Sequence, residues 1–582
     1  YVMQRFMRAA IGTHNIDNCS RVCHSPTSWA LRRSFGLSGA TGSFDDIEAA
    51  EVALLIGVNP TQGHPVVGAR IKQAALEGLQ LITADPRRIE LADYGALHLA
   101  NRPGTNAALV NGLTHVLIRD GLADEAFIAE RTEGYDAVAQ VVDSYTPASV
   151  QEITGVPAGD VERAAHLYGE ADRACILWGL GVTEHLYGSE VVQLLCNMAL
   201  LTGQVGRPGA ALLPLRGQNN VQGSSDMGAL PDTFTDYRSV TDDEVTSSFE
   251  QRWGVEMKRE RGMKIPEMFD AAVEGRLKAM YIFGADVAQT DPDTTHVEAA
   301  LSSLDFLVCQ DIFENETTRY ADVILPASSF LEKEGTFTNA ERRLQLVSPA
   351  APPPGAAKTD FEILTTMSSA LGHDMGYETP SDVMDEIAAM TPRYAGLSHE
   401  RIGRDGLQWP VAADGTDTPI LYSERFELLG GKARFAALPY KPPGEEADAE
   451  YPLILVTGRR LERYNAGTMT RRTANLDLMP EDWLEIHPAD AAELEVEDRS
   501  RVALRSRRGE IELPVRVTER IEPGHVFTAF HFPETRTNLL VGSSSDVNTS
   551  CPEYKVVAVA VEPVGAARPV APAGEPALLP LG

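Results

Sequence analysis

The fold is decided by residues 52–88, which read VALLIGVNPTQGHPVVGARIKQAALEGLQLITADPRR. The short apolar runs at 52–58 and 79–85 are typical of strands that are buried on both faces of a parallel sheet, and residues 65–77 have the apolar spacing of a helix. This alternation predicts a parallel-sheet α/β fold. Further strands of this kind are predicted at 175–179, 280–284, 306–311 and 322–325, and a second helix at 190–201.

The composition is that of an acidic globular protein. The 582 residues include 51 Lys and Arg against 83 Asp and Glu, a net charge of −32, and 43% of them are hydrophobic. At roughly 100–200 residues per domain, this length predicts three to five domains. The negative charge argues against nucleic acid or an anionic membrane surface as a partner. Any anionic substrate must therefore be bound by a local basic site.

The cysteines and the apolar segments exclude further classes of protein. The six cysteines are scattered, which excludes a disulfide scaffold. No apolar run reaches the ~20 residues that span a bilayer, so we expect no direct membrane insertion. No signal peptide is visible at the start of the sequence, and we expect a cytoplasmic protein.

The texture of the sequence changes after residues 440–450, where a Lys-Pro-Pro-Gly sequence meets an acidic run. Residues 502–532 alternate apolar and polar side chains around Arg508-Gly509, which predicts hairpins and a small barrel. A proline-rich stretch at 349–358 is interpreted as an extended connector. Residues 566–582, rich in Pro and Ala, are interpreted as a tail.

Several predicted strands end in glycine, aspartate or amide residues. Ligands bind at the carboxyl ends of strands in open α/β sheets, and glycines there let the backbone approach a phosphate. The sequence has no complete GxGxxG and no Walker loop. Each strand end alone fits an ordinary turn, but five of them predict a large or duplicated nucleotide-like ligand. The five are Gly57-Val58-Asn59, Asp85-Pro86-Arg87, Gly179-Leu180-Gly181, Gly284-Ala285-Asp286 and Gln310-Asp311.

Cys23-His24 stands in the unusual segment RVCHSPT at 21–27. A lone cysteine is most often an inert buried residue, its spacing to Cys19 is poor for zinc, and no protease signature surrounds Cys23. A thiolate ligand to a redox metal fits equally well. Further along, RGQNNVQG at 216–223 joins one arginine to several amides, a pattern that can clamp a small carboxylate.

Together these motifs resemble the catalytic subunits of molybdenum- or tungsten-dependent formate dehydrogenases, in the dimethyl sulfoxide reductase superfamily. The resemblance covers nearly the whole chain in unbroken order, and residues 216–232 are its most specific part. The other motifs are RVCH at 21–24, NP at 59–60, HP at 64–65, DPR at 85–87, RTEG at 131–134, ILWG at 176–179, QDIF at 310–313, ADVILP at 321–326, EGTFT at 334–338, MTRR at 469–472 and PEYK at 552–555.

The resemblance implies two-electron oxidation of formate to CO2, or the reverse, at a bis-molybdopterin guanine dinucleotide that carries Mo or W with a terminal sulfido ligand. Cys23 would ligate the metal, His24 would lie beside it, and Arg216 would hold the formate carboxylate. His24 fits removal of the C–H hydrogen either as a hydride or as a proton. A nitrate or other oxyanion reductase and a non-catalytic cofactor-bearing subunit are the alternatives, and His24 together with Arg216 favours formate.

The resemblance also implies the domain organisation and the cofactor contacts. Two α/β pterin-dinucleotide domains are expected, one formed by 1–22 with 217–440 and one by 23–216, followed by a β-barrel-like domain at 441–565. The implied contacts are Asn59, Asp85, Arg87, Gly179, Gly181, Gln218, Gly284, Asp286, Thr290, Gln310, Asp311, Ser328, Asp360, Arg459, Arg460, Asn538, Tyr554 and Lys555.

The sequence departs from the family at its start. The family has an N-terminal domain in which four cysteines bind a [4Fe-4S] cluster, and here no cysteine cluster precedes Cys23. We therefore expect that cluster only from an N-terminal domain outside this sequence or from another chain. Besides formate and CO2, the implied partners are iron–sulfur subunits and flavin- or NAD-linked electron-transfer subunits.

Overall fold

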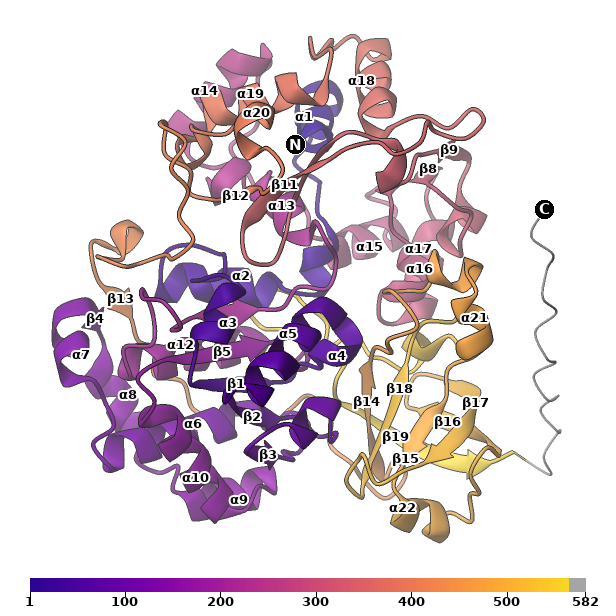
Figure 1. Ribbon diagram of the computed structural model, residues 1–582. Coiled ribbons are helices and arrows are strands. Elements are labelled where there is room, and N and C mark those ends of the chain that lie inside the picture. The colour runs from indigo at the N-terminus through magenta and orange to yellow at the C-terminus, as the bar shows by residue number, and fades with distance from the viewer. Residues whose placement is uncertain (565–582) are drawn as a thin grey trace, which may run out of the picture.

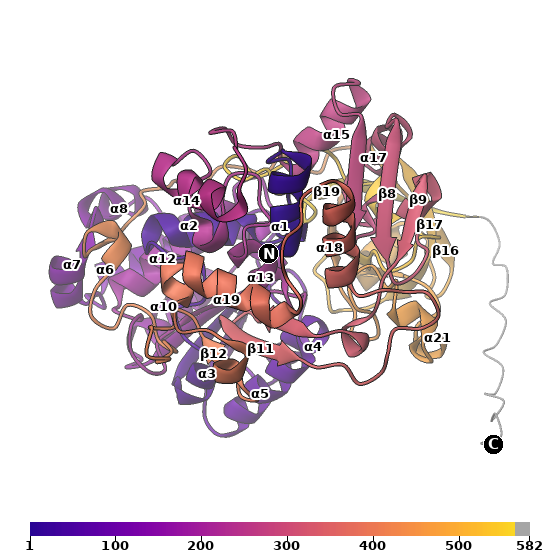
Figure 2. The same cartoon turned by 90° about the horizontal axis from the view of Figure 1, so that it is seen from above.

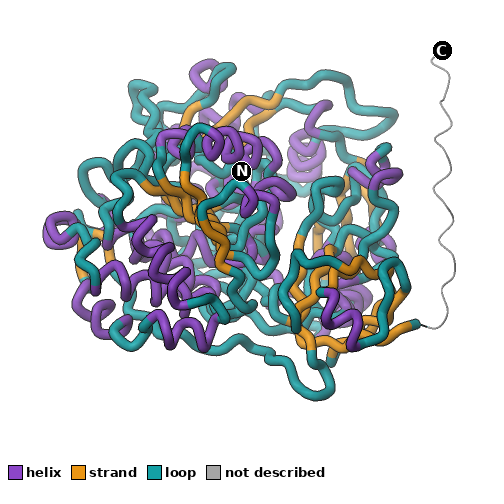
Figure 3. Tube along the Cα trace, turned by 60° about the horizontal axis from the view of Figure 1, so that its bottom comes forward, coloured by secondary structure: helices purple, strands orange, loops and turns teal. Residues whose placement is uncertain are grey.

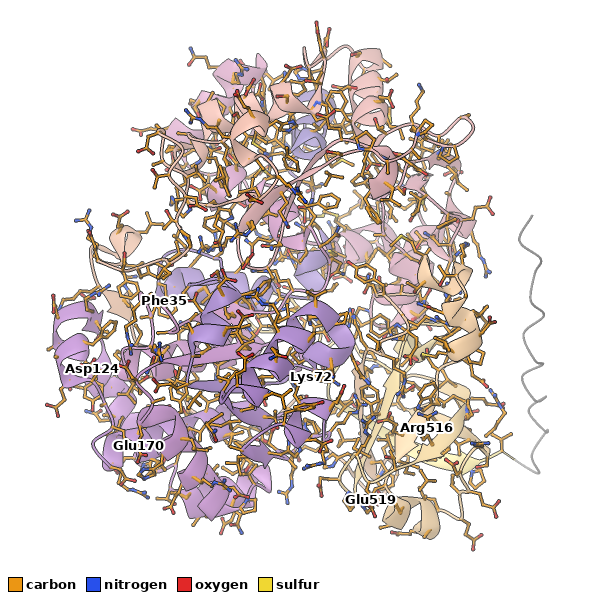
Figure 4. The ribbon with its side chains drawn as sticks, viewed as in Figure 1. Phe35, Lys72, Asp124, Glu170, Arg516 and Glu519 are labelled. Carbon is orange, nitrogen blue, oxygen red and sulfur yellow. The ribbon has the colours of Figure 1, made fainter. Side chains whose placement is uncertain are left out.

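The computed structural model describes residues 1–564, and the predicted tail at 566–582 lies outside them. Figure 1 shows a helix-covered sheet in the early part of the chain, a smaller sheet in its middle part and a barrel in its last part. Figure 3 shows the barrel strands gathered on one side of the molecule, beside the helix-rich remainder. Figure 4 labels Lys72 on the sheet region and Arg516 and Glu519 on the barrel beside it.

Five parallel strands form the larger sheet, in the order β3-β2-β1-β5-β6. Successive side chains of β1 pack on opposite faces, Leu55 in one buried cluster and Ile56 in the other. Because helices cover both faces, the strands are continuously apolar, as the runs at 52–58 and 79–85 predicted. The strands are β1 (Val52–Ile56), β2 (Gln80–Ala84), β3 (Leu97–Leu99), β5 (Ala174–Trp178) and β6 (Leu212–Pro214).

The helices of this region pack in two layers. α2, α6, α10 and α12 contribute to the buried cluster on one face, and α3 and α5 to the cluster on the other. The helix predicted at 65–77 is α5, and the one predicted at 190–201 is the greater part of α12, which is buried along its whole length. The bounds are α2 (Ser25–Ser34), α3 (Asp45–Ala49), α4 (Pro60–Gly63), α5 (Pro65–Leu76), α6 (Asn106–Arg119), α7 (Glu125–Arg131), α8 (Tyr135–Val142), α9 (Pro147–Thr154), α10 (Ala158–Gly169), α11 (Leu180–Thr183) and α12 (Gly188–Leu201).

A second, smaller sheet holds three parallel strands in the order β7-β8-β9. Ile282 and Leu307 of this sheet pack with the helices α15 to α17 in one buried cluster. In Figure 2, α18 lies beside these strands. The bounds are β7 (Ala279–Phe283), β8 (Phe306–Asp311), β9 (Val323–Pro326), α15 (Ile265–Val273), α16 (Val287–Thr290), α17 (Thr294–Ser302) and α18 (Asp360–Ala370).

The C-terminal part is a closed six-stranded barrel in the order β14-β18-β15-β17-β16-β19. The hairpin predicted around Arg508-Gly509 joins β16 to β17, and the side chains of β16 alternate between buried and half-buried. The predicted fold class, a parallel-sheet α/β protein with a C-terminal barrel, is confirmed, while the predicted domain boundaries stay a prediction. The strands are β14 (Leu453–Gly458), β15 (Leu484–Ile486), β16 (Arg501–Ser506), β17 (Glu510–Val517), β18 (His525–Ala529) and β19 (Val557–Pro563).

The remaining elements connect these parts. A small antiparallel sheet is formed by β10 (Gly335–Thr338), β11 (Arg343–Val347) and β12 (Leu407–Gln408). The predicted connector at 349–358 runs from β11 to α18 with no helix of its own and a single strand-like bridge, between Lys358 and Ala327. In the part of the chain that the structure describes, no helix combines the length and the apolar character needed to cross a membrane.

Candidate active site

A cavity lies where the carboxyl ends of β1, β2 and β5 meet the barrel. This edge of a parallel sheet is where α/β proteins bind ligands. We call it the first cavity. Nine of the predicted site residues line it: Cys23, Asn59, Asp85, Arg87, Gly179, Gly181, Gln218, Arg459 and Lys555.

Two glycines bring the ends of β1 and β5 together at this cavity. Gly181 N donates to Gly57 O at 2.9 Å. A Cβ atom on Gly181 would lie 2.6 Å from the Cα atom of Gly57, and Gly57 itself has a φ of +56°. A side chain at either position would push the two backbones apart. The glycines predicted from the strand ends are therefore required by backbone packing, and they leave backbone groups bordering the cavity.

Cys23 and His24 stand directly before α2, after a 3₁₀ turn, and both are buried. Thr183 Oγ1 donates to the carbonyl oxygen of Cys23 at 2.6 Å and so fixes the main chain at the cavity wall. Burial raises the pKa of the Cys23 thiol well above its ordinary value, with a further contribution from Glu184. A thiolate at this buried position therefore requires a cation beside its sulfur. A metal ion bound to Cys23 would supply that cation.

The His24 ring is held in one tautomer. Its Nε2 lies 3.3 Å from the carbonyl oxygen of Leu215, which can only accept, so Nε2 carries the proton. Its Nδ1 lies 3.0 Å from Thr27 Oγ1, which also accepts from Trp178 Nε1 at 3.0 Å. Burial, with help from the charge of Arg216, lowers the pKa of His24 well below its ordinary value. The ring is therefore neutral, and Nδ1 accepts the Thr27 hydroxyl proton.

Arg216 follows β6, and its side chain is buried. Nη2 donates to Ser28 Oγ at 3.3 Å and to Ser38 O at 3.2 Å, whereas Nη1 has no partner within residues 1–564. Within the same residues no carboxylate forms an ion pair with it at 4.0 Å or less. Burial lowers the pKa of Arg216, and nearby Tyr237 and Asp226 act against that shift. A buried guanidinium with a free donor is suited to bind a small anion.

A buried ion pair borders the first cavity on the barrel side. Lys555 Nζ lies 2.7 Å from Glu184 Oε2 and donates to Thr457 O at 2.8 Å. Both side chains of the pair are at most 7% exposed. Lys555 was predicted as a cofactor contact, and Glu184, which holds it, was not.

A second buried group joins the sheet to the barrel. Glu485 on β15 accepts from Arg87 at 3.0 Å and from Arg460 at 2.7 Å. The guanidinium of Arg87 also stacks on Phe527, and that of Arg460 on Trp483. Arg87 lines the first cavity, but Arg460 does not. It is directed to Glu485, which alternates with the core residues Leu484 and Ile486 and so faces outward from β15.

A larger cavity borders the second sheet, and we call it the second cavity. The predicted contacts Gly284, Thr290 and Asp360 line it. Gln310 Nε2 donates to Asp360 Oδ1 at 2.7 Å, which links the end of β8 to α18. Two barrel residues reach the same place, because Asn538 Nδ2 and Tyr554 OH donate to Thr290 O at 2.9 and 3.0 Å.

The other predicted residues lie around these strand ends without lining either cavity. Asp286 Oδ1 accepts from the backbone and hydroxyl of Thr317 at 3.0 and 2.8 Å, and Asp311 Oδ2 accepts from Asn315 Nδ2 at 2.9 Å. Outside the two linings stand His24, Arg216, Asp286, Gln310, Asp311, Ser328, Arg460, Asn538 and Tyr554.

Several lining residues of the first cavity were missed. Gln62, Gly63 and His64 belong to α4 and its C-terminal cap, directly after Asn59, and the strand-end rule applied to β1 covers them as well. Asn101 follows β3, a strand of three residues whose sequence carries no apolar run. The remaining missed residues include Asn106, His185, Thr457 and Gly458.

Buried polar atoms without partners indicate what these cavities take up. Buried donors and acceptors are almost always hydrogen-bonded, so such atoms point to a missing polar ligand. Within residues 1–564 they include both ring nitrogens of His64, Asn101 Oδ1, Arg216 Nη1, Asp286 Oδ2, Gln289 Oε1, Ser328 Oγ and Asn538 Oδ1. The atoms named here lie around the strand ends of the two sheets, whereas others, such as Tyr168 OH, lie in the helix layers; those at the strand ends fit a large ligand with many polar groups.

Comparison with known families identifies the class. The model of the molybdopterin oxidoreductase family matches residues 1–370, and the model of the Molydopterin dinucleotide binding domain matches residues 453–558. The chain belongs to the molybdopterin oxidoreductase family and is an oxidoreductase. The resemblance carried by the motifs is confirmed. The unpartnered polar atoms at both cavities fit a pterin dinucleotide.

Individual relatives of this chain include proteins named formate dehydrogenase. The alpha subunit of F420-dependent formate dehydrogenase 2 from Methanococcus maripaludis is 42% identical over 569 residues, 97% of this chain and 84% of that protein. Formate dehydrogenase H from Escherichia coli is 38% identical over 576 residues, 98% of this chain and 80% of that protein. Acetylene hydratase from Pelobacter acetylenicus has the same fold, with a TM-score of 0.74 at 20% identity over 97% of this chain and 84% of that one.

Proposed function

We propose that this chain is the catalytic subunit of a formate dehydrogenase, which oxidises formate to CO2 or runs the reverse reaction. One observation carries the proposal: Arg216 keeps a free, buried guanidinium donor close to Cys23 and His24, in a chain that is 38–42% identical to proteins named formate dehydrogenase. A planar guanidinium binds a carboxylate through two parallel hydrogen bonds, which suits formate.

The proposed cofactor is a bis-molybdopterin guanine dinucleotide with Mo or W and a terminal sulfido ligand, held through Cys23. When bound, it accepts the two electrons that formate oxidation releases. The residues around the first cavity would hold one dinucleotide, and those around the second cavity the other. The orphaned polar atoms at both sets of strand ends support this assignment.

Two side chains have direct roles in this proposal. Arg216 binds formate through its free Nη1 donor, and a second parallel bond, which would fix where the C–H bond points, requires Nη2 to release Ser28 or Ser38. His24 is neutral, with Nε2 protonated and Nδ1 satisfied by Thr27. Its lowered pKa means that a proton taken up by the ring is passed on at neutral pH and not retained. Both ring nitrogens are engaged by protein partners, so in this proposal Nδ1 accepts a proton only when the Thr27 hydroxyl turns away from it.

Electrons leave through partners outside this chain in the proposal. Iron–sulfur subunits with flavin- or NAD-linked modules are the proposed partners, and a [4Fe-4S] cluster from a preceding domain or another chain would connect them. We place the assembly in the cytoplasm. Because relatives carry F420-dependent in their names, F420 belongs among the acceptors to test.

The test starts from the purified holoprotein, with metal and pterin content measured before activity. Formate-dependent reduction of a viologen dye is expected, and nitrate-dependent oxidation of the reduced dye is not. Cys23→Ala should abolish turnover and deplete the metal. Arg216→Lys should keep metal and pterin but raise the formate KM, since lysine cannot form the bidentate contact.

Two results would count against the proposal. Nitrate reduction without formate oxidation would assign the chain to the oxyanion reductases. Full metal content and full formate turnover in Cys23→Ala would rule out Cys23 as the metal ligand. As a matched control, Cys196→Ala changes a fully buried cysteine in α12, away from both cavities, and should leave metal content unchanged.

A further inference from the structure

Asp226 is a fully buried carboxylate that the proposed mechanism does not use. It ends α13 (Val221–Asp226), and three side chains donate to it. Gln222 Nε2 at 2.6 Å and Tyr237 OH at 2.9 Å bind Oδ1, and Trp409 Nε1 at 2.8 Å binds Oδ2. Gln222 lies one turn earlier in the same helix, Tyr237 lies 11 residues away and Trp409 lies 183 residues away. The carboxylate is therefore a built feature of the fold.

The charge of Asp226 acts on Arg216 without an ion pair. The carboxylate raises the pKa of Arg216 against the effect of burial, yet no ion pair of 4.0 Å or less joins the two within the described residues. The three donors occupy both oxygens of Asp226 and hold them away from Arg216 Nη1. The guanidinium thus keeps a free donor for an anion while a negative charge stands close by.

The network can accommodate both protonation states of Asp226. The ionised form accepts the hydroxyl proton of Tyr237. The protonated form can donate to the same hydroxyl oxygen, which then turns its proton toward Ser38, whose buried Oγ has no partner in residues 1–564. Ser38 O is also an acceptor of Arg216, so the two groups share a neighbour.

Among Asp226 and the groups that face it, Asp226 is the one that titrates near neutral pH. Burial raises its pKa to about 7, and the bonds from Gln222 and Tyr237 and the charge of Arg216 oppose that rise. Burial raises the pKa of Tyr237 and of Tyr394, so both stay neutral. Arg342 faces it as well, and burial lowers its pKa to about 10, so it stays charged.

We propose that Asp226 is a positioning residue of the anion site, whose charge sets the affinity of Arg216 for formate. The inference rests on the proposed function, because it takes formate as the ligand. Protonated Asp226 leaves the positive charge of Arg216 uncompensated, and ionised Asp226 repels the anion. Formate affinity is therefore highest below the Asp226 pKa of about 7 and falls as pH rises through it. The gain or loss of one charge near a buried anion site, at an effective dielectric constant of ~20, predicts a change of about tenfold or more.

The experiment measures formate affinity of the holoenzyme against pH, between about pH 5.5 and 8.5. Calorimetric binding without an electron acceptor gives Kd, and viologen reduction gives KM and kcat. In the wild type, Kd and KM should rise about tenfold across this range. In Asp226→Asn, both should stay at the low, acidic value throughout, because the negative charge is gone.

Tyr237→Phe separates an electrostatic role from a purely structural one. The variant removes one donor to the ionised carboxylate, which raises the pKa of Asp226 further. The rise in KM should therefore move to higher pH, and a structural defect would not move it. Asp482→Asn is the matched control, because Asp482 is a buried barrel carboxylate whose pKa burial also raises to about 7. Its pH profile should match the wild type.

Four outcomes are informative. An unchanged pH profile in Asp226→Asn, or weak formate binding at every pH in that variant, overturns the inference. Formate oxidation with a pH-independent KM in the wild type also overturns it, while leaving the proposed function standing. Formate binding with the expected profile but no oxidation supports the role of Asp226 and removes the proposed function.

Discussion

Replacing Glu485 with glutamine should weaken the attachment of the barrel to the larger sheet. Glu485 on β15 pairs with Arg460 at 2.7 Å and with Arg87 at 3.0 Å, and the three side chains are 2%, 4% and 8% exposed. Arg87 stands beyond the end of β2, and Arg460 follows β14 of the barrel. The amide leaves two buried cations without an anion and turns an N–H group toward one of them.

The size of the effect follows from the burial of all three groups. Leaving a buried charge without its partner costs about 3–5 kcal/mol. Arg460 cannot escape by losing its proton, because burial lowers its pKa only to about 10. Stacking on Phe527 at 3.5 Å and on Trp483 at 3.8 Å holds both arginines in place in either variant. We therefore expect the free energy of unfolding to fall by about 3–4 kcal/mol.

Urea unfolding of the holoprotein followed by tryptophan fluorescence measures this loss, because Trp483 stacks directly on Arg460. Pterin content should fall too, since Arg87 lines the first cavity. Glu48→Gln is the control: its pair with Arg70 is short, at 2.6 Å, but exposed, and should contribute less than about 1 kcal/mol. If Glu485→Gln and Glu48→Gln cost the same, the buried group does not couple the two parts.

Three further changes test the site. Gly181→Ala should lower the free energy of unfolding by about 1–3 kcal/mol and reduce pterin content, because the new Cβ would lie 2.6 Å from Gly57. Gly159→Ala is the control, because a Cβ there would have nothing within 4 Å, and it should change neither quantity in the same urea and pterin assays. Lys555→Met should lower the free energy of unfolding by about 3 kcal/mol, because it leaves Glu184 buried without its partner. The double variant with Glu184→Gln removes that unpaired charge, so it should restore stability in urea but not pterin content. Thr27→Val removes the hydroxyl that donates to His24 Nδ1, so kcat in viologen assays should fall about tenfold at an unchanged formate KM. Thr27→Ser keeps the hydroxyl and should have a kcat near that of the wild type. An equal fall of kcat in Thr27→Ser would contradict a role for the hydrogen bond.

The fold was largely predictable because its strands are locally encoded. The run at 306–311 coincides with β8, whose central residues 307–309 are apolar and buried, as expected of the middle strand of a parallel sheet. The hairpin at Arg508-Gly509 was predictable because alternation of period two flanks a turn. Strand β3 has three residues and no such pattern, and its position depends on pairing with β2. Short strands set by a neighbour leave no local signal.

The site was predictable where motif and strand end coincide, and it was not where contacts join distant segments. Cys23, Asn59 and Asp85 line the first cavity as the motifs implied. Arg460 stays a predicted cofactor contact, and in the structure it pairs with Glu485, 25 residues away on β15, which β18 separates from β14. The contact of Trp409 with Asp226 spans 183 residues. Side-chain direction at such places is set by tertiary packing, which sequence spacing does not encode.

The net charge of −32 is compatible with an anionic ligand because charge is distributed unevenly. The described lining of the first cavity holds Arg87, Arg459 and Lys555 with Asp85, whose pKa burial raises to about 6; Arg87 and Lys555 are paired with Glu485 and Glu184, and Arg459 has no ion pair within residues 1–564. Exposed charges are screened beyond about 8 Å at physiological ionic strength, whereas buried ones are screened much less. An anion at the cavity therefore responds to these few cations and to Asp226 more than to the acidic exterior. The affinity for a small carboxylate is set locally, and Asp226 is the group through which pH can change it.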